Sequence, residues 1–346
     1  MHWYPLCFEP VFKTVIWGGK DLSSYKGMDV ALEGVGESWE VSAVPGSVSV
    51  VSEGPLAGRT LTDLLAADPV GLVGQSVYEK YGLTFPLLVK FIDAAADLSI
   101  QVHPDDVLAA SRHQSFGKSE LWYVIAAQPG ARLVSGFSTR ITPEEYEQRI
   151  ADNSIEEVLC YHDVQPGDVF YLPAGRVHAI GAGILLAEIQ QSSDITYRLY
   201  DYNRKDAQGK SRELHTAWAK EAIDYTLYPS WRTDYPNVSN QVVPLVKSSY
   251  FTTNRICLDM NDKDNQNEQD KTIQWIDNTL LMDRSYEQLG SFVVMLCMEG
   301  EGWLRAKGHD PIFIHQGQTL LVPAAIGRVQ VGTKSRCLLL ESYIEA

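Results

Sequence analysis

The sequence has few cysteines and no long apolar run. Its 346 residues include five cysteines, an odd number without a C-x-x-C pair: Cys7, Cys160, Cys257, Cys297 and Cys337. Scattered thiols of this kind indicate a reducing compartment and argue against a disulfide framework. No apolar run approaches the length needed to cross a bilayer, which excludes a helical membrane protein.

Basic residues are also scarce. The chain has 29 Lys and Arg against 44 Asp and Glu, a formal net charge of −15. This excess disfavours nucleic acid and anionic membranes as partners. The N-terminus lacks a basic segment followed by an apolar core, so it does not read as a secretory signal. We therefore expect a cytoplasmic protein, as a monomer or a dimer, whose partner is a small molecule.

The length fits about two domains, and short strand-like runs separated by turns predominate. Helical patterns interrupt the first part of the chain at residues 61–67, 70–81, 142–160 and 214–224. The clearest helix follows Thr142, which has Glu145 three residues later as a capping box requires. The pattern predicts a mainly β protein with helical insertions in its N-terminal half.

The most informative segment is Gly167-Asp-Val-Phe-Tyr-Leu-Pro-Ala-Gly-Arg-Val-His178. Its β-branched and aromatic residues predict a strand, and Pro173 and Gly175 then predict a corner. A histidine fixed on such a corner points into the mouth of a small β-barrel, where metals and ligands bind. The spacing resembles the second motif of the cupin superfamily, except that Ala182 stands where that motif has Asn.

Further metal-ligand candidates lie upstream of this corner. Gln101 and His103 are two residues apart, so they share one face of a strand, and Pro104 ends that strand. Glu120 begins another aromatic and β-branched run. With His178, these side chains offer two imidazole nitrogens, a carboxylate oxygen and an amide oxygen, a set that suits Zn²⁺.

Each candidate also has a purely structural interpretation. A histidine beside a proline is commonly a hydrogen-bonded structural residue, and Glu120 alone could be an exposed strand carboxylate. The four together, in order and on strand-like runs, favour a metal site. The other six histidines lack such a setting, and we interpret them as surface or structural residues: His2, His113, His162, His215, His309 and His315.

The first two thirds of the chain resemble the type I phosphomannose isomerase family, in its short bacterial form. The matching segments are Phe12-Lys-x-x-Ile-Trp-Gly-Gly19, Gly36-Glu-Ser-Trp-Glu-Val-Ser42, Leu88-Val-Lys-Phe-Ile-Asp93, Leu98-Ser-Ile-Gln-Val-His-Pro-Asp-Asp106, Gly117-Lys-Ser-Glu-Leu-Trp-Tyr123, Tyr171-Leu-Pro-Ala-Gly-Arg-Val-His178 and Glu188-Ile-Gln-Gln-Ser-Ser-Asp-Ile-Thr-Tyr-Arg-Leu-Tyr-Asp201. This combination is much more specific than the cupin motif alone.

The resemblance implies a function and a set of site residues. That family interconverts mannose 6-phosphate and fructose 6-phosphate with one Zn²⁺ per chain. Its ligands correspond to Gln101, His103, Glu120 and His178. Its catalytic arginine corresponds to Arg198, its active-site lysine to Lys118, and a further acidic residue to Glu188.

The chemistry of such a reaction needs a base near C1 and C2, an electrophile for the developing oxyanion and an anchor for the phosphate. We assign positive charge to Lys118 and Arg198 and proton transfer to Glu188. Glu188 could instead pair with a nearby arginine, and Arg198 could pair with Asp194 or Asp201. Given the negative net charge, we expect a local basic cluster for the phosphate: Lys90, Lys118, Arg176, Arg198 and Arg204.

The last third of the chain contains an echo of the first motif. Gly317 is followed by five residues and Pro323, and Arg328 stands at the ligand position. Residues 292–304 predict a hairpin with glycine at its turn, and the polar residues 259–274 predict an exposed loop. We expect two cupin-like antiparallel β-barrels: a metal-binding catalytic domain at residues 1–240 and a degenerate domain without metal at residues 241–346.

Two alternatives remain open from the sequence. Another cupin metalloenzyme, such as a dioxygenase or an epimerase, would share the corner motif, although oxygenases usually rely on a His-x-His pair. A non-catalytic, metal-stabilised sugar-binding protein would keep the metal ligands but would not need Lys118 or Arg198. Both are present, which favours the isomerase.

Overall fold

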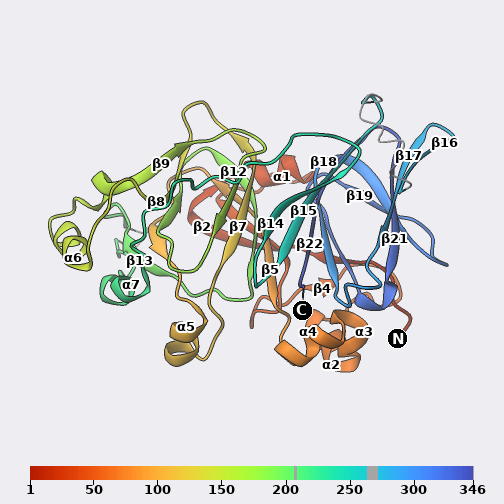
Figure 1. Cartoon of the computed structure of the whole chain (residues 1–346), viewed down its shortest axis with the longest axis horizontal. Coiled ribbons are helices and arrows are strands. Elements are labelled where there is room, and N and C mark those ends of the chain that lie inside the picture. Colours follow the sequence, from red (N-terminus) through yellow and green to blue (C-terminus); the bar gives the residue numbers. More distant parts are fainter. Residues whose placement is uncertain (206–208, 263–271, 346) are drawn as a thin grey trace.

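The computed structural model describes residues 1–205, 209–262 and 272–345, and antiparallel strands are its main regular structure (Figure 1). The expected mainly β, antiparallel class is therefore confirmed. Part of the loop predicted at 259–274 lies outside the described residues, since 263–271 are not among them. No helix in the described ranges is both long and apolar enough to cross a membrane.

The N-terminal half is built on a six-stranded and a five-stranded sheet. The six-stranded sheet runs in the order β10 (Val169–Leu172), β7 (Glu120–Ala127), β12 (Ile184–Gln191), β5 (Leu87–Ala94), β2 (Val11–Gly19) and β3 (Val35–Val41). The five-stranded sheet runs in the order β13 (Tyr197–Tyr200), β6 (Ile100–Val102), β11 (His178–Ile180), β8 (Arg132–Phe137) and β9 (Leu159–Asp163).

One apolar cluster draws side chains from both of these sheets. Trp122 of β7 and Ile92 of β5 belong to it, as do Leu133 of β8 and Ile180 of β11. Alternate residues of a strand point to opposite faces, so each strand contributes its inward set to this shared core. The two sheets therefore form a sandwich whose inner faces meet.

The corner predicted at Pro173 and Gly175 joins the two layers of this sandwich. β10 before the corner pairs with β7, whereas β11 after it pairs with β6 and β8. Gly175 has φ +89°, and an added Cβ would lie 2.9 Å from the Ala222 carbonyl oxygen. The corner thus needs glycine, and it delivers His178 from one sheet to the other.

Helices cover the outer face of the five-stranded sheet. α6 (Pro143–Ala151), η1 (Ile155–Val158) and α7 (Thr216–Ala222) pack there around Tyr146 and Ala219. The capping box of Thr142 and Glu145 is present. The predicted helix at 142–160 was too long, because Asp152 accepts hydrogen bonds from Ser154 and Asn153 turns left-handed. The helix predicted at 214–224 is likewise shorter than expected.

Three short helices pack against the C-terminal half: α2 (Leu61–Ala67), α3 (Pro69–Val73) and α4 (Gln75–Tyr81). The single helix predicted at 70–81 was wrong, since Gly74 at φ +88° divides it in two. A Cβ at Gly74 would lie 1.8 Å from the Gly290 carbonyl oxygen. Two further helices are α1 (Asp21–Tyr25) and α5 (Asp106–His113).

The C-terminal half forms an eleven-stranded sheet that folds around its own apolar core. Its strands are β1 (Leu6–Glu9), β4 (Val50–Val51), β14 (Val242–Lys247), β15 (Thr252–Asp259), β16 (Ile273–Ile276), β17 (Thr279–Ser285), β18 (Val293–Ala306), β19 (Ile312–His315), β20 (Thr319–Val322), β21 (Arg328–Thr333) and β22 (Arg336–Tyr343). A short helix, η2 (Ala324–Ile326), follows Pro323.

The hairpin predicted at 292–304 was wrong. These residues form the single strand β18, whose register shifts between Cys297 and Glu299. Its first part pairs with β20 and its last part with β19 and β21. Gly300 at φ +75° lets the strand bend, so that it continues from its pairing with β20 to its pairing with β19 and β21 instead of turning back.

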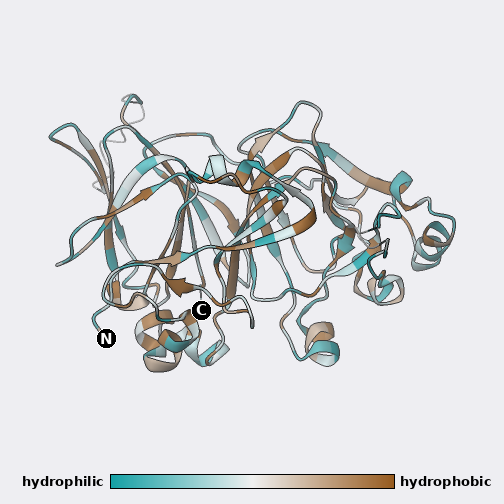
Figure 2. Cartoon of the chain, turned by 180° about the vertical axis from the view of Figure 1, so that it is seen from behind, coloured by the Kyte–Doolittle hydropathy of each residue, from teal (hydrophilic) through white to brown (hydrophobic). Residues whose placement is uncertain are grey.

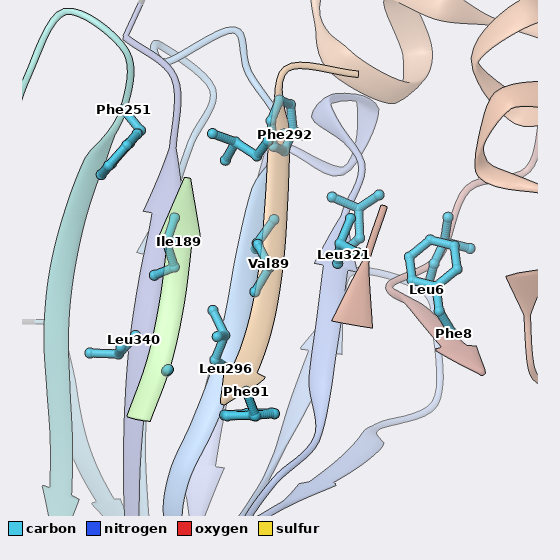
Figure 3. Packing of buried hydrophobic residues seen from close by; sticks show 14 of the residues in the cluster. Leu6, Phe8, Val89, Phe91, Ile189, Phe251, Phe292, Leu296, Leu321 and Leu340 are labelled. Carbon is cyan, nitrogen blue, oxygen red and sulfur yellow. The ribbon is translucent and has the colours of Figure 1, made fainter. Parts of the chain in front are cut away.

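The two halves share the largest apolar core (Figure 3). Val89 and Ile189 from the outer face of the six-stranded sheet lie beside Leu296 and Leu340 from the C-terminal sheet (Figure 3). Hydrophobic residues follow these central strands, and hydrophilic residues concentrate in the surrounding loops (Figure 2). The six-stranded sheet is consequently buried on both faces.

The N-terminal strand belongs to the C-terminal sheet. Leu6 of β1 pairs with Leu321 of β20, and Phe8 pairs with Val51 of β4. The division into domains at residues 1–240 and 241–346 stays a prediction. Among the described residues, no pairing joins the two end strands of the six-stranded or the five-stranded sheet, so these sheets are not closed barrels.

Candidate metal centre and cavity

Strand register aligns a row of polar side chains on the inner face of the six-stranded sheet. Glu188 of β12 stands opposite Trp122 of β7 on one side and opposite Lys90 of β5 on the other. Lys90 is in turn opposite Trp39 of β3. Glu120 lies two residues before Trp122, so it shares the same face.

The facing sheet carries a second row. Gln101 of β6 lies between Arg198 of β13 and His178 of β11 in the cross-strand register. His103 follows directly after β6, and its carbonyl oxygen accepts a hydrogen bond from the backbone N–H of Gly175 in the corner. The corner therefore links the two histidines that the sequence placed 75 residues apart.

The predicted metal ligands converge between these rows. His103, Glu120 and His178 offer ligand atoms that all lie within 4.8 Å of one another, and all three residues are buried. His178 Nε2 is 3.2 Å from Glu120 Oε1, and His103 Nε2 is 3.5 Å from Glu120 Oε2. Gln101 Nε2 lies 3.3 Å from His178 Nε2, and exchanging the amide O and N would aim its oxygen there.

Backbone carbonyls orient both imidazoles. His103 Nδ1 lies 2.8 Å from the carbonyl oxygen of Ile195, and His178 Nδ1 lies 2.8 Å from that of Arg176. A carbonyl oxygen can only accept, so each Nδ1 carries the proton and donates. Each Nε2 then presents a lone pair toward Glu120, the arrangement typical of metal-binding histidines.

Electrostatics keep this cluster in the protonation states that bind a cation. Burial and the nearby charge of Lys118 together lower the pKa of His103 to about 3, so the imidazole is neutral at neutral pH. Burial opposes ionisation of Glu120, but the adjacent ammonium of Lys118 outweighs it, and the pKa of Glu120 lies well below the usual range. Neither carboxylate oxygen of Glu120 accepts a hydrogen bond. These donors fit a divalent cation.

Lys118 joins the cluster from the cavity side. Its Nζ lies 3.0 Å from Glu120 Oε2 and 3.2 Å from His103 Nε2. The side chain is buried, and it also lines a cavity of about 220 Å³ between the two sheets. Positive charge is therefore held beside the candidate metal ligands.

The same cavity contains a buried row of alternating charges. Lys90 Nζ lies 3.2 Å from Glu188 Oε1 and 3.8 Å from Glu37 Oε2. Trp122 Nε1 donates to Glu188 Oε2 at 2.9 Å. Burial disfavours the charged form of Lys90, but Glu37 and Glu188 outweigh it and raise its pKa. Burial also opposes ionisation of Glu37, and Lys90 outweighs it, so the pKa of Glu37 is lowered.

Arg198 lines the cavity without a carboxylate partner among the described residues. Asp201, which could have paired with it, instead binds Arg212 through two hydrogen bonds of 2.8 and 2.6 Å and also contacts Arg204. Burial lowers the pKa of Arg198, and Arg212 adds to this effect. Its Nε makes no hydrogen bond.

The predicted site residues therefore assemble. Gln101, Lys118, Glu188 and Arg198 line the cavity, and His103, Glu120 and His178 form the adjoining cluster. The alternative partners proposed for Glu188 and Arg198 do not bind them; Lys90 and Trp122 bind Glu188 instead.

Two members of the expected basic cluster lie elsewhere. Arg176 stacks on Trp231 and Tyr228 and donates to the Tyr171 carbonyl oxygen. Arg204 pairs with Asp201. Arg176 follows the glycine of the corner and faces away from the cavity, which the sequence spacing did not reveal.

The sequence assigned no role to Glu37, Trp39 or Arg212, all of which line the cavity. Glu37 and Trp39 reach it through the long-range pairing of β3 with β5, which no local pattern encodes. Lys90 did carry a signal, because it interrupts the apolar strand β5 on the face shared by Leu88 and Ile92.

Known proteins match most of the chain. A model of the phosphomannose isomerase type I catalytic domain matches residues 6–121. Mannose-6-phosphate isomerase ManA of Bacillus subtilis is 35% identical over 338 residues, covering 97% of this chain and 98% of that protein. The mannose-6-phosphate isomerase of Streptococcus mutans is 44% identical over 252 residues, covering 72% of this chain and 77% of that protein.

Solved structures give the same picture. The crystal structure of mannose 6-phosphate isomerase from Bacillus subtilis superposes with a TM-score of 0.83 and 30% identity, covering 99% of this chain and all of that one. A putative mannosephosphate isomerase from Archaeoglobus fulgidus shares the fold, with a TM-score of 0.75 at 21% identity.

The buried charge row predicts a pH-dependent defect for Lys90→Gln. Without the ammonium, burial would raise the pKa of Glu37 in the folded state. The carboxyl of the unfolded chain then ionises first as the pH rises, so the fold loses stability between the unfolded-state and the folded-state pKa. We expect a loss of about 3 kcal/mol in unfolding free energy at about pH 7.5, shrinking toward about pH 5. Urea unfolding at both pH values measures this loss of unfolding free energy. Lys247→Gln, at an exposed pair with Glu345, is the control, and a pH-independent loss would contradict the assignment.

Proposed function

The chain belongs to the type I phosphomannose isomerase family, and we propose that it interconverts mannose 6-phosphate and fructose 6-phosphate with one Zn²⁺ per chain. Its relatives from Bacillus subtilis and Streptococcus mutans, both mannose-6-phosphate isomerases, support this choice of substrate. The observation that carries the proposal is the convergence of a His-Glu-His cluster with a cavity containing Lys118, Glu188 and Arg198.

In this proposal Gln101, His103, Glu120 and His178 hold the metal. The lone pairs of the two Nε2 atoms and the carboxylate oxygens of Glu120, which accept no hydrogen bond, are the donors. A bound Zn²⁺ supplies Lewis acidity that polarises or orients substrate oxygens.

The side chains of the cavity would perform the proton transfer. Moving a proton between C1 and C2 passes through an enediol-type intermediate, whose negative charge needs nearby cations. Lys118 and Arg198 lie on the cavity wall and provide them. The guanidinium of Arg198 lacks a carboxylate partner in the described part of the chain, so it is free to hold phosphate or an oxygen pair of the substrate.

Glu188 is our proposed base. Its carboxylate lies on the cavity wall, and Lys90 and Trp122 hold both oxygens in fixed positions. In this role the carboxylate of Glu188 accepts the proton that moves between C1 and C2.

We further propose that the two halves are cupin-like units, with a metal-binding domain at residues 1–240 and a degenerate one at 241–346. The inner corner of the first half carries His178, whereas the equivalent corner of the second half carries η2 and an exposed Arg328. A dioxygenase or an epimerase, or a sugar-binding protein without catalysis, is less well supported. The cavity retains the cations that isomerisation needs, and the curated relatives are named as isomerases.

The activity is tested with purified protein and mannose 6-phosphate in an assay coupled to the formation of fructose 6-phosphate. We expect turnover that disappears after chelation and returns when Zn²⁺ is added back, since the metal completes the site. No turnover in the presence of Zn²⁺ would overturn the proposal.

The metal-binding role is tested by His178→Ala. We expect loss of stoichiometric zinc, because the variant removes an imidazole donor from a set of four. Inductively coupled plasma mass spectrometry on untreated protein measures the content. His162→Ala, a half-buried histidine outside the cluster, should keep its metal. Full zinc retention in His178→Ala would exclude the ligand role.

Arg198→Ala tests the catalytic arginine. Removing an unpaired cation from the cavity should lower kcat by about 100-fold or more while leaving zinc content and melting temperature near wild type. Arg328→Ala, in a solvent-exposed pair with Glu287, is the matched control and should retain full activity. A near-normal rate for Arg198→Ala would make that residue structural.

A further inference from the structure

A second and larger cavity, of about 450 Å³, lies where the two halves of the chain meet. Its walls come from β7 and the turn before β10, from strands β15, β18 and β22, and from the connecting segment at residues 232–237. None of the residues lining it lines the catalytic cavity.

Arg255 of β15 is the unusual feature of this cavity. Its side chain is buried, with 3% of its surface exposed. Its guanidinium donates to the carbonyl oxygen of Val238 at 2.9 Å and to the amide oxygen of Asn237 at 2.8 Å, and Nε makes no hydrogen bond. Tyr123 also contacts it through its phenol. All of these partners are neutral.

No carboxylate among the described residues forms an ion pair with Arg255. The two other arginines of the cavity are already paired: Arg232 with Asp168 at 3.3 Å, and Arg336 with Glu299 at 2.9 Å and with Asp259. Asp234 also lines the cavity, but it is exposed to solvent. Arg255 is therefore the cation that lacks a counter-charge.

A buried charge is normally paired, because transferring an isolated ion from water into a protein is costly. A guanidinium carries five N–H donors in a planar fork that matches the oxygens of phosphate or carboxylate. Tyr123, whose hydroxyl can donate to an anion, lines the same cavity, whereas the hydroxyl of Tyr235 donates to the carbonyl oxygen of Gly167.

We propose that this cavity is a second ligand site, which binds a small oxyanion, a phosphate or a carboxylate group, on Arg255. The site goes beyond the proposed isomerase function and does not require Arg198. Carboxylates already neutralise Arg232 and Arg336, so Arg255 is the group that holds the anion.

The cavity also adjoins the element that carries Glu120. β7 begins with Glu120 in the metal cluster, and Tyr123, Val124 and Ile125 further along the same strand line the second cavity. Tyr123 points to the opposite face of the sheet from Trp122, since their positions are adjacent. The two sites therefore lie on opposite faces of one strand.

The test is isothermal titration of zinc-loaded protein with inorganic phosphate. Four proteins are compared: wild type, Arg255→Gln, Arg198→Ala and the double variant. We expect Arg255→Gln to weaken one phosphate-binding event by about tenfold or more, in the wild-type and in the Arg198→Ala background alike. Unchanged phosphate affinity in Arg255→Gln, or no phosphate binding in Arg198→Ala, overturns the proposal.

Two further arms keep the test decisive. In one arm acetate replaces phosphate, which distinguishes a preference for carboxylate from a preference for phosphate. If wild type binds either anion and Arg255→Gln does not, the result supports the site. If Arg255→Gln fails to fold, Asn237→Ala and Tyr123→Phe are titrated instead, and weakening by severalfold in both supports the site, whereas wild-type affinity in both overturns it. Turnover of mannose 6-phosphate by Arg255→Gln in the absence of added anion should match wild type, which separates this site from the catalytic one.

Discussion

The fully buried carboxylate of Glu120 is the constraint on which the N-terminal half depends. A negative charge in a sheet core is tolerated only when cationic or metal partners surround it. Two imidazoles and the ammonium of Lys118 lie within about ion-pair distance, and both imidazoles are fixed by backbone carbonyls. The corner after β10, the end of β6 and the start of β7 must therefore meet at one point.

In the sandwich, two rows of polar side chains, each formed by cross-strand neighbours, lie face to face between the sheets. One row supplies alternating carboxylate and ammonium groups, and the other supplies the arginine, the amide and an imidazole. Neither row needs a flexible loop to position it, since adjacent strands set the spacing. The outer face of the six-stranded sheet packs on the C-terminal half. That half therefore supports the sheet from behind and contributes none of its described residues to the cavity that Lys118, Glu188 and Arg198 line.

Local sequence carried much of this information. The Gly-Pro-Gly-His corner, the Gln-x-His pair and the lysine inside an apolar strand each have a local signature, and the structure brings Gln101, Lys118 and Glu188 to the same cavity. What failed was non-local. Glu37 and Trp39 reach the cavity through the pairing of β3 with β5. Arg176 was misplaced because the corner turns it outward, and Gly300 bends β18 where a glycine was interpreted as a hairpin turn.

The pairing of β1 with β20 has a consequence for how the chain is made. A ribosome releases Leu6 at the beginning of synthesis and Leu321 near its end. Until then the first strand lacks the neighbour on one of its edges, and unpaired strand edges recruit other chains. Its short length of four residues limits that exposure. The nascent polypeptide thus completes its fold only when its last strands emerge to enclose its first.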